Sequence, residues 1–132
     1  MGALLETWAE VAAAIEVRWP VQWRNPDLVA FAWQKEIVEA VRAELGGRER
    51  LLIGVKIAPA GGIVAQDALV MNSQRLIGNL MILNGTLVAR EVMTIGRFDA
   101  TELEEVITAL AKGAEPSRSK LTRPQANPGY VD

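Results

Sequence analysis

The feature that most constrains the fold is the stretch "LMILNGTLVAREV" at residues 80–92. Apolar runs flank Asn84-Gly85, and Asn-Gly is the preferred pair for a type I′ turn because both central residues need a positive φ. The stretch therefore predicts a β-hairpin with strands at about 79–83 and 86–95. It indicates an antiparallel sheet whose register matters, since a one-residue slip would turn the apolar face outward.

A helix with clear boundary signals follows the hairpin in "DATELEEVITALAKG", residues 99–113. Asp99 is expected to cap it, Glu102 can complete a capping box, and Gly113 is expected to end it. Helical spacing of apolar residues predicts two further helices, at 3–16 and at 63–78.

Two segments read as strands before the hairpin. "LVAFAW", residues 28–33, alternates bulky and small residues and places Val29, Phe31 and Trp33 on one face. "RLLIGVKIAP", residues 50–59, is the second strand, and Pro59 ends it.

Two other segments are less determined. Residues 18–27 are expected to form a loop because prolines interrupt both helix and sheet ladders; Trp19 and Trp23 there either cover an edge of the core or form a patch for a partner. Residues 36–45 fit both a helix and a strand: propensity favours the helix, and tertiary context can favour the strand.

Composition places the protein in a broad class. The 132 residues are half apolar and carry 14 basic and 16 acidic side chains, a net charge of −2. This near-balance argues against binding to nucleic acid or to an anionic membrane surface, and no apolar run is long enough to span a bilayer. The absence of cysteine and of a basic leader predicts a cytoplasmic protein. We expect one domain at 1–114 and a disordered polar tail at 115–132.

The residue types for most catalytic chemistry are missing. The chain has no histidine and no cysteine, which excludes the usual zinc sites and catalytic triads. The acids at 102–105 are explained as a solvated helix face, and the glycine pairs lack phosphate-binding motifs. The sequence therefore predicts a protein that is not an enzyme and needs no cofactor or metal. Arg90 has two interpretations, a solvent-facing guanidinium or a charge at a dimer or ligand surface.

Together the elements predict an α+β fold with an antiparallel sheet of about five strands and two to three helices, in the order helix, strands, helix, hairpin, helix. This order resembles the type III secretion chaperone-like superfamily, which includes class I chaperones of the Tir-chaperone type and YbjN-like regulators. The resemblance covers residues 65–114, including "ALVMNSQRLIGNLMILNGTLVAREVMTIGRFDATELEEVITALAKGA". It also implies a strand at 37–45.

The resemblance implies a homodimer that holds another protein chain. The middle helix and the hairpin would form the dimer interface, and apolar grooves and sheet edges would take an extended client segment. Carried over, the resemblance gives Arg90 as a dimer-interface position and gives as dimer-interface or core positions Leu69, Leu76, Leu80, Ile82, Val88 and Val92. The client-binding candidates are Trp19, Trp23, Val29, Phe31 and Trp33.

Two alternatives belong to other functional classes. The Trp-Pro segment and the charged tail would also suit a small structural or assembly component of a multiprotein complex, for example a phage-like one. A regulatory ligand-binding domain that uses carboxylates is the other alternative.

Overall fold

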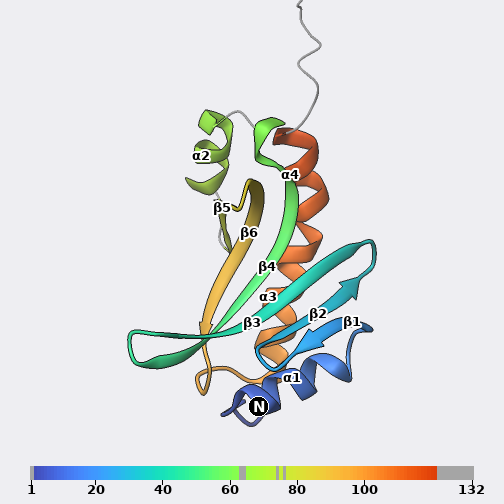
Figure 1. Cartoon of the computed structure of the whole chain (residues 1–132), viewed down its shortest axis with the longest axis vertical. Helices are drawn as coiled ribbons and strands as arrows, with labels where there is room; N and C mark the ends of the chain where they lie inside the picture. The colour runs from blue at the N-terminus through green and yellow to red at the C-terminus, as the bar shows by residue number, and fades with distance from the viewer. Residues whose placement is uncertain (1, 63–64, 74, 76, 122–132) are drawn as a thin grey trace, which may run out of the picture.

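The computed structural model describes residues 2–62, 65–73, 75 and 77–121. The helices are α1 (Trp8–Glu16), α2 (Ala65–Ser73), α3 (Ala100–Lys112) and α4 (Ala114–Leu121), with a short 3-10 helix η1 (Ala60–Gly62). The strands are β1 (Val21–Asn25), β2 (Leu28–Trp33), β3 (Glu36–Leu45), β4 (Arg48–Pro59), β5 (Asn79–Leu83) and β6 (Thr86–Thr94) (Figure 1).

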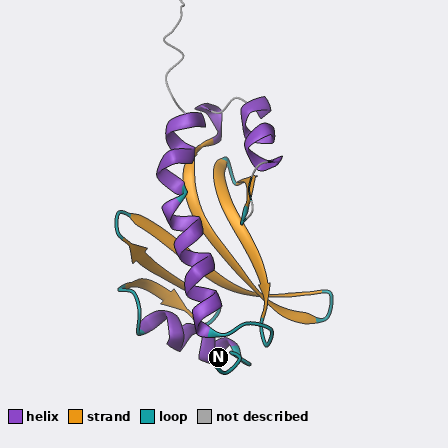
Figure 2. Ribbon diagram, turned by 180° about the vertical axis from the view of Figure 1, so that it is seen from behind, coloured by secondary structure: helices purple, strands orange, loops and turns teal. Residues whose placement is uncertain are grey.

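One antiparallel sheet organises the described residues, with its six strands in the order β1-β2-β3-β4-β6-β5. Figure 1 looks onto a face that α3 leaves open, and the slant of β1–β3 against the steep β4 and β6 shows the strong twist of the sheet. Figure 2 shows α3 and α4 passing across the opposite face. The α+β class is confirmed, with one strand more than expected.

The core lies between the sheet and the helices. Fully buried side chains come from alternate positions of the central strands and from the apolar stripes of α1 and α3; they include Val11, Ile15, Val29, Phe31, Val38, Ile53, Leu103, Ile107 and Leu110. Because strand side chains alternate between faces, the residues between these positions point to the open face.

The hairpin and the α3 boundary agree with the sequence. Asn84 and Gly85 have φ values of 50° and 78°, and Leu83 pairs with Thr86 across the turn. The Asp99 carboxylate accepts a hydrogen bond from Glu102 N at 2.8 Å, and Asp99 N donates to Glu102 Oε1 at 3.0 Å. The capping box is therefore complete.

The loop expected at 18–27 is wrong in part, because residues 21–25 form the edge strand β1. Pro20 precedes the strand and Pro26 lies in the turn that follows it, so neither proline has to donate to a ladder. The pairing shifts between Val21 and Trp23, which leaves Gln22 as the extra residue of a β-bulge.

The open question at 36–45 is resolved in favour of a strand. β3 pairs with β2 on one side and with the twelve-residue β4 on the other. Val38 and Ala40 reach the core at period 2. Burial between two neighbouring strands therefore outweighs the helix propensity of the segment.

The disordered tail expected from residue 115 is wrong for 115–121, which belong to α4. Gly113 has φ −81° and ψ −7°, a helical conformation, so the chain passes directly from α3 into α4. Ser117 and Leu121 are buried, and Arg118 donates to the carbonyls of Ile57 at 2.7 Å and Lys56 at 3.2 Å. These carbonyls lie where the pairing of β4 with β6 shifts register, so Arg118 satisfies acceptors beside an irregular part of the ladder.

Within the described residues, no helix has the length and apolar character needed to cross a membrane.

Candidate interaction surfaces

The open face of the sheet contains a groove of about 770 Å³. Its sides are β3 and the β5–β6 hairpin, and its floor is β4; the lining residues are Glu36, Ile37, Glu39, Val41, Leu52, Gly54, Lys56, Leu83, Asn84, Thr86, Val88 and Arg90. Ile37 and Val92, on the two outer sides of this face, are 47% and 42% exposed. Apolar side chains are thus presented to solvent on a sheet face that no helix covers.

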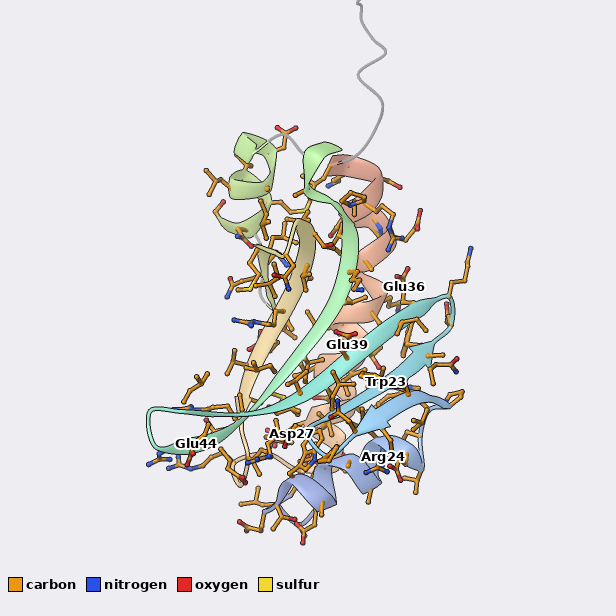
Figure 3. All side chains as sticks on the ribbon, in the orientation of Figure 1. Trp23, Arg24, Asp27, Glu36, Glu39 and Glu44 are labelled. Carbon is orange, nitrogen blue, oxygen red and sulfur yellow. The ribbon has the colours of Figure 1, made fainter. Side chains whose placement is uncertain are left out.

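Two opposite charges lie in one row across this face. Glu39 pairs with Gly54, and Gly54 pairs with Arg90, so the acid and the base flank the glycine on the same side of the sheet. Figure 3 labels Glu39 on β3 in the same view. Arg90 Nε is buried and has no hydrogen-bond partner among the described residues. An unpaired buried donor is costly, which marks Arg90 as the most unusual residue of the groove.

The structure separates the expected dimer-interface residues. Val88, Arg90 and Val92 point to the open face, whereas Leu80 and Ile82 pair with Ala89 and Leu87 and so point to the helix-covered face. Leu80 is buried there. The two strands of the hairpin therefore present these residues on opposite faces of the sheet.

The other two expected dimer positions lie on or near α2. Leu69 is exposed on α2, and Leu76 falls outside the described residues.

The expected client-binding residues separate in the same way. Val29 and Phe31 are fully buried in the core, which corrects their assignment to a surface. Trp19 stacks on Phe31 with ring centroids 5.1 Å apart, and Trp33 is half-buried against the same core. Trp23 is 56% exposed because the bulge at Gln22 turns it to the open face, where it pairs with Ala30 (Figure 3).

A second groove, of about 480 Å³, lies where Trp33 and the β2–β3 turn meet the helices. Arg118 crosses it to Glu36 at 3.0 Å, and Glu36 is only 14% exposed. The hydrogen bond with Glu36 raises the pKa of the Arg118 guanidinium, which therefore stays cationic. This pair fastens α4 to the start of β3 and is best explained as structural.

The two edges of the sheet differ. At the β5 edge, the Asn72 side chain accepts from Leu80 N at 2.6 Å and donates to Leu80 O at 3.0 Å, so α2 occupies the place of a neighbouring strand. At the other edge, β1 pairs with β2 alone among the described strands, and four of its five residues are exposed. An open edge can accept an added strand from another chain.

Asn72 and Glu39 were missed as site residues. A polar residue on the apolar side of a predicted helix was the available signal for Asn72. Glu39 could be placed on the open face only once residues 36–45 were known to form a strand. Within the part of the chain that the structure describes, no group of three acidic side chains is placed to hold a metal ion.

Comparison with solved structures places the fold. A chain in the crystal structure of the ExsC–ExsE complex matches with a TM-score of 0.70 at 13% identity, over 91% of this chain and 99% of that one. A chain in the HopA1–SchA chaperone–effector complex matches with a TM-score of 0.61 at 15% identity, over 88% and 91%. No protein-family model and no curated protein sequence matches the chain. The chain therefore shares its overall fold with these two chains, one of them from a chaperone–effector complex.

Proposed function

We propose that this protein is a cytoplasmic, non-enzymatic binding module that forms a homodimer and holds a segment of a partner polypeptide. The observation that carries the proposal is a sheet with helices on one face and an apolar groove on the other, in a fold shared with a chain of a chaperone–effector complex. The YbjN-like subtype stays a prediction from sequence.

The client surface that we propose is the β1 edge with Trp23. The exposed edge offers backbone groups for an added strand, and the indole offers a large rigid apolar contact beside it. Main-chain hydrogen bonds would supply affinity with little sequence preference, while Trp23 would favour clients with an apolar residue at the matching position. The β5 edge is less suited to accept an added strand, because the Asn72 amide already bonds the backbone of Leu80 there.

The test begins with the native complex. The tagged protein is purified from the cells that produce it, the bound polypeptide is identified by mass spectrometry, and the complex is rebuilt from purified components. We expect a complex of fixed stoichiometry in which one client segment resists proteolysis. Purified protein that forms no such complex with any recovered polypeptide would contradict the proposal.

A substitution pair locates the client surface. We expect Trp23→Ala to weaken the rebuilt complex about tenfold or more, because exposed tryptophans at interfaces are frequent hot spots. Leu45→Ala removes another exposed side chain, near the tip of the β3–β4 hairpin, and should leave the affinity unchanged. Equal effects of the two variants would place the client elsewhere.

A further inference from the structure

The charges in the Glu39–Gly54–Arg90 row of the open face have no partners among the described residues. Among the described residues, Glu39 and Arg90 make no ion pair, and Arg90 Nε has no hydrogen-bond acceptor. β4 runs between them, and because neighbouring strands lie about 4.8 Å apart, their backbones are about 10 Å apart. An acid and a base at matched positions on the two sides of β4 make this row complementary to itself.

We propose that the open face binds a second copy of this chain. The two copies are related by a twofold axis that lies between their sheets, parallel to β4 and above Gly54. Rotation about this axis exchanges the two sides of the row, so Arg90 of each copy faces Glu39 of the other. The interface would then contain two identical ion pairs, as an isologous contact requires. The inference rests on the homodimer of the proposed function and names the surface and the residues that form it.

The apolar residues of the groove follow the same symmetry. β3 and β6 both run antiparallel to β4, so Val41 and Val92 lie in the row on one side of the charged row, and Ile37 and Val88 in the row on the other. The same rotation brings Val41 over Val92 and Ile37 over Val88. Leu52, on β4, meets its own copy. Two sheets that pack face to face, about 10 Å apart, interdigitate such side chains into a common core.

Lys56 is the one charged residue of the central strand β4 that lines the groove. It would face its own copy near the axis, which is unfavourable if the two ammonium groups remain there. Its four-carbon stem allows the ammonium group to reach the rim of the interface while the stem covers apolar surface. The ion pairs therefore depend on Glu39 and Arg90, and Lys56 contributes contact area.

The arrangement leaves the outer edge of β1 free. With β4 at the centre, β3 lies over β6 of the second copy and β2 over its β5. β1 lies opposite the place beside β5 that α2 of the second copy occupies, and its outer edge stays at the periphery while Trp23 lies near that helix. Dimer formation and client binding can thus be measured independently.

Charge reversal tests the proposal because the pairing is reciprocal. Glu39→Arg places arginine at both positions of one chain, and Arg90→Glu places glutamate at both. Each variant alone meets two like-charge contacts in its own dimer, and we expect its dimer dissociation constant to rise about 100-fold or more. An equal mixture of the two variants restores both attractive pairs, so we expect heterodimers to form.

The measurement is analytical ultracentrifugation over a concentration series, at low and at high salt. Circular dichroism and thermal unfolding verify that each variant is folded. Glu105→Arg and Lys112→Glu, exposed positions on α3, make the same changes of charge on the other face and should leave the dimer intact. Repulsion between the two like charges of one chain would persist in the mixture, because each chain keeps both of its charges. Recovery of the dimer in the mixture therefore shows that the charges interact between chains.

The outcomes are distinct. Weak single variants with a heterodimer in the mixture support the proposal. Single variants that dimerise as tightly as the wild type overturn this interface. A mixture in which no heterodimer forms also overturns it. In both cases the proposed homodimer is not contradicted. A wild-type protein that remains monomeric overturns both the interface and the homodimer, whereas the proposed binding of a client is decided by its own reconstitution.

Discussion

Both faces of the sheet carry apolar residues, but the two faces have different neighbours. Ile53 and Leu52 are adjacent on β4: Ile53 is fully buried under the helices, and Leu52 lines the open groove. The helix-covered face supplies the core that stabilises the chain. The open face buries no comparable surface within the monomer, so its apolar and unpaired charged residues are better explained by association than by folding.

The largest expected effect comes from substituting these two neighbours separately. Ile53→Ala should lower the free energy of unfolding by about 2–5 kcal/mol, because it removes buried methyl groups and leaves a cavity. Leu52→Ala should cost less than about 1 kcal/mol in the monomer, since the side chain is already partly in water. Urea denaturation at dilute protein concentration measures both values. Similar losses for the two variants would show that the faces do not differ in this way.

Arg118 tests how the covered face is completed. Arg118→Leu should lower the free energy of unfolding by about 2 kcal/mol, because the carbonyls of Ile57 and Lys56 and the carboxylate of Glu36 lose their donor; partial solvent access keeps the loss moderate. Lys120→Leu, an exposed position on the same helix, is the matched control and should change stability by less than about 0.5 kcal/mol. An Arg118→Leu variant with an unchanged free energy of unfolding would show that the contacts of α4 through Arg118 do not stabilise the covered face.

The capping box at α3 should have a smaller effect. Asp99→Ala is expected to cost about 1 kcal/mol because Glu102 N loses its acceptor at the start of the helix. Thr101→Ala lies in the same turn, on the exposed side, and should be close to neutral. Thermal unfolding measures this difference. Equal losses of stability in the two variants would show that the capping box does not stabilise α3.

The smallest global effect is expected at the β5 edge. Asn72→Ala removes both side-chain hydrogen bonds to the backbone of Leu80, so the Leu80 amide should exchange hydrogen about tenfold faster or more. The free energy of unfolding should fall by about 1 kcal/mol or less. Hydrogen exchange followed by NMR measures the amide directly. Unchanged protection of Leu80 would mean that Asn72 does not close this edge.

Local signals in the sequence were sufficient for the hairpin and for α3. The Asn84-Gly85 turn also determined the faces, because pairing Leu83 with Thr86 places even-numbered residues of β5 beside odd-numbered residues of β6. Leu80 and Ile82 could therefore have been separated from Val88, Arg90 and Val92 before the structure was known. The resemblance grouped these residues without assigning them to faces of the sheet.

Other features depended on tertiary context. The bulge at Gln22 turns Trp23 to the open face, and no local residue pattern predicts it. The alternation of Val29 and Phe31 placed them on one face but could not say that this face is the core. Residues 36–45 became a strand because β2 and β4 flank them, and α4 forms on the covered face because Arg118 and Leu121 find partners there.

We have proposed that the open face is an interface between two copies of the chain. Because the chain has no cysteine, Leu52→Cys gives a single thiol on the central strand of that face. A bismaleimide reagent with an arm of roughly 10 Å matches the separation of packed sheets. We predict cross-linked dimers for Leu52→Cys and none for Ala109→Cys, an exposed position on α3. Cross-linking of Ala109→Cys with Leu52→Cys remaining monomeric would contradict the claim.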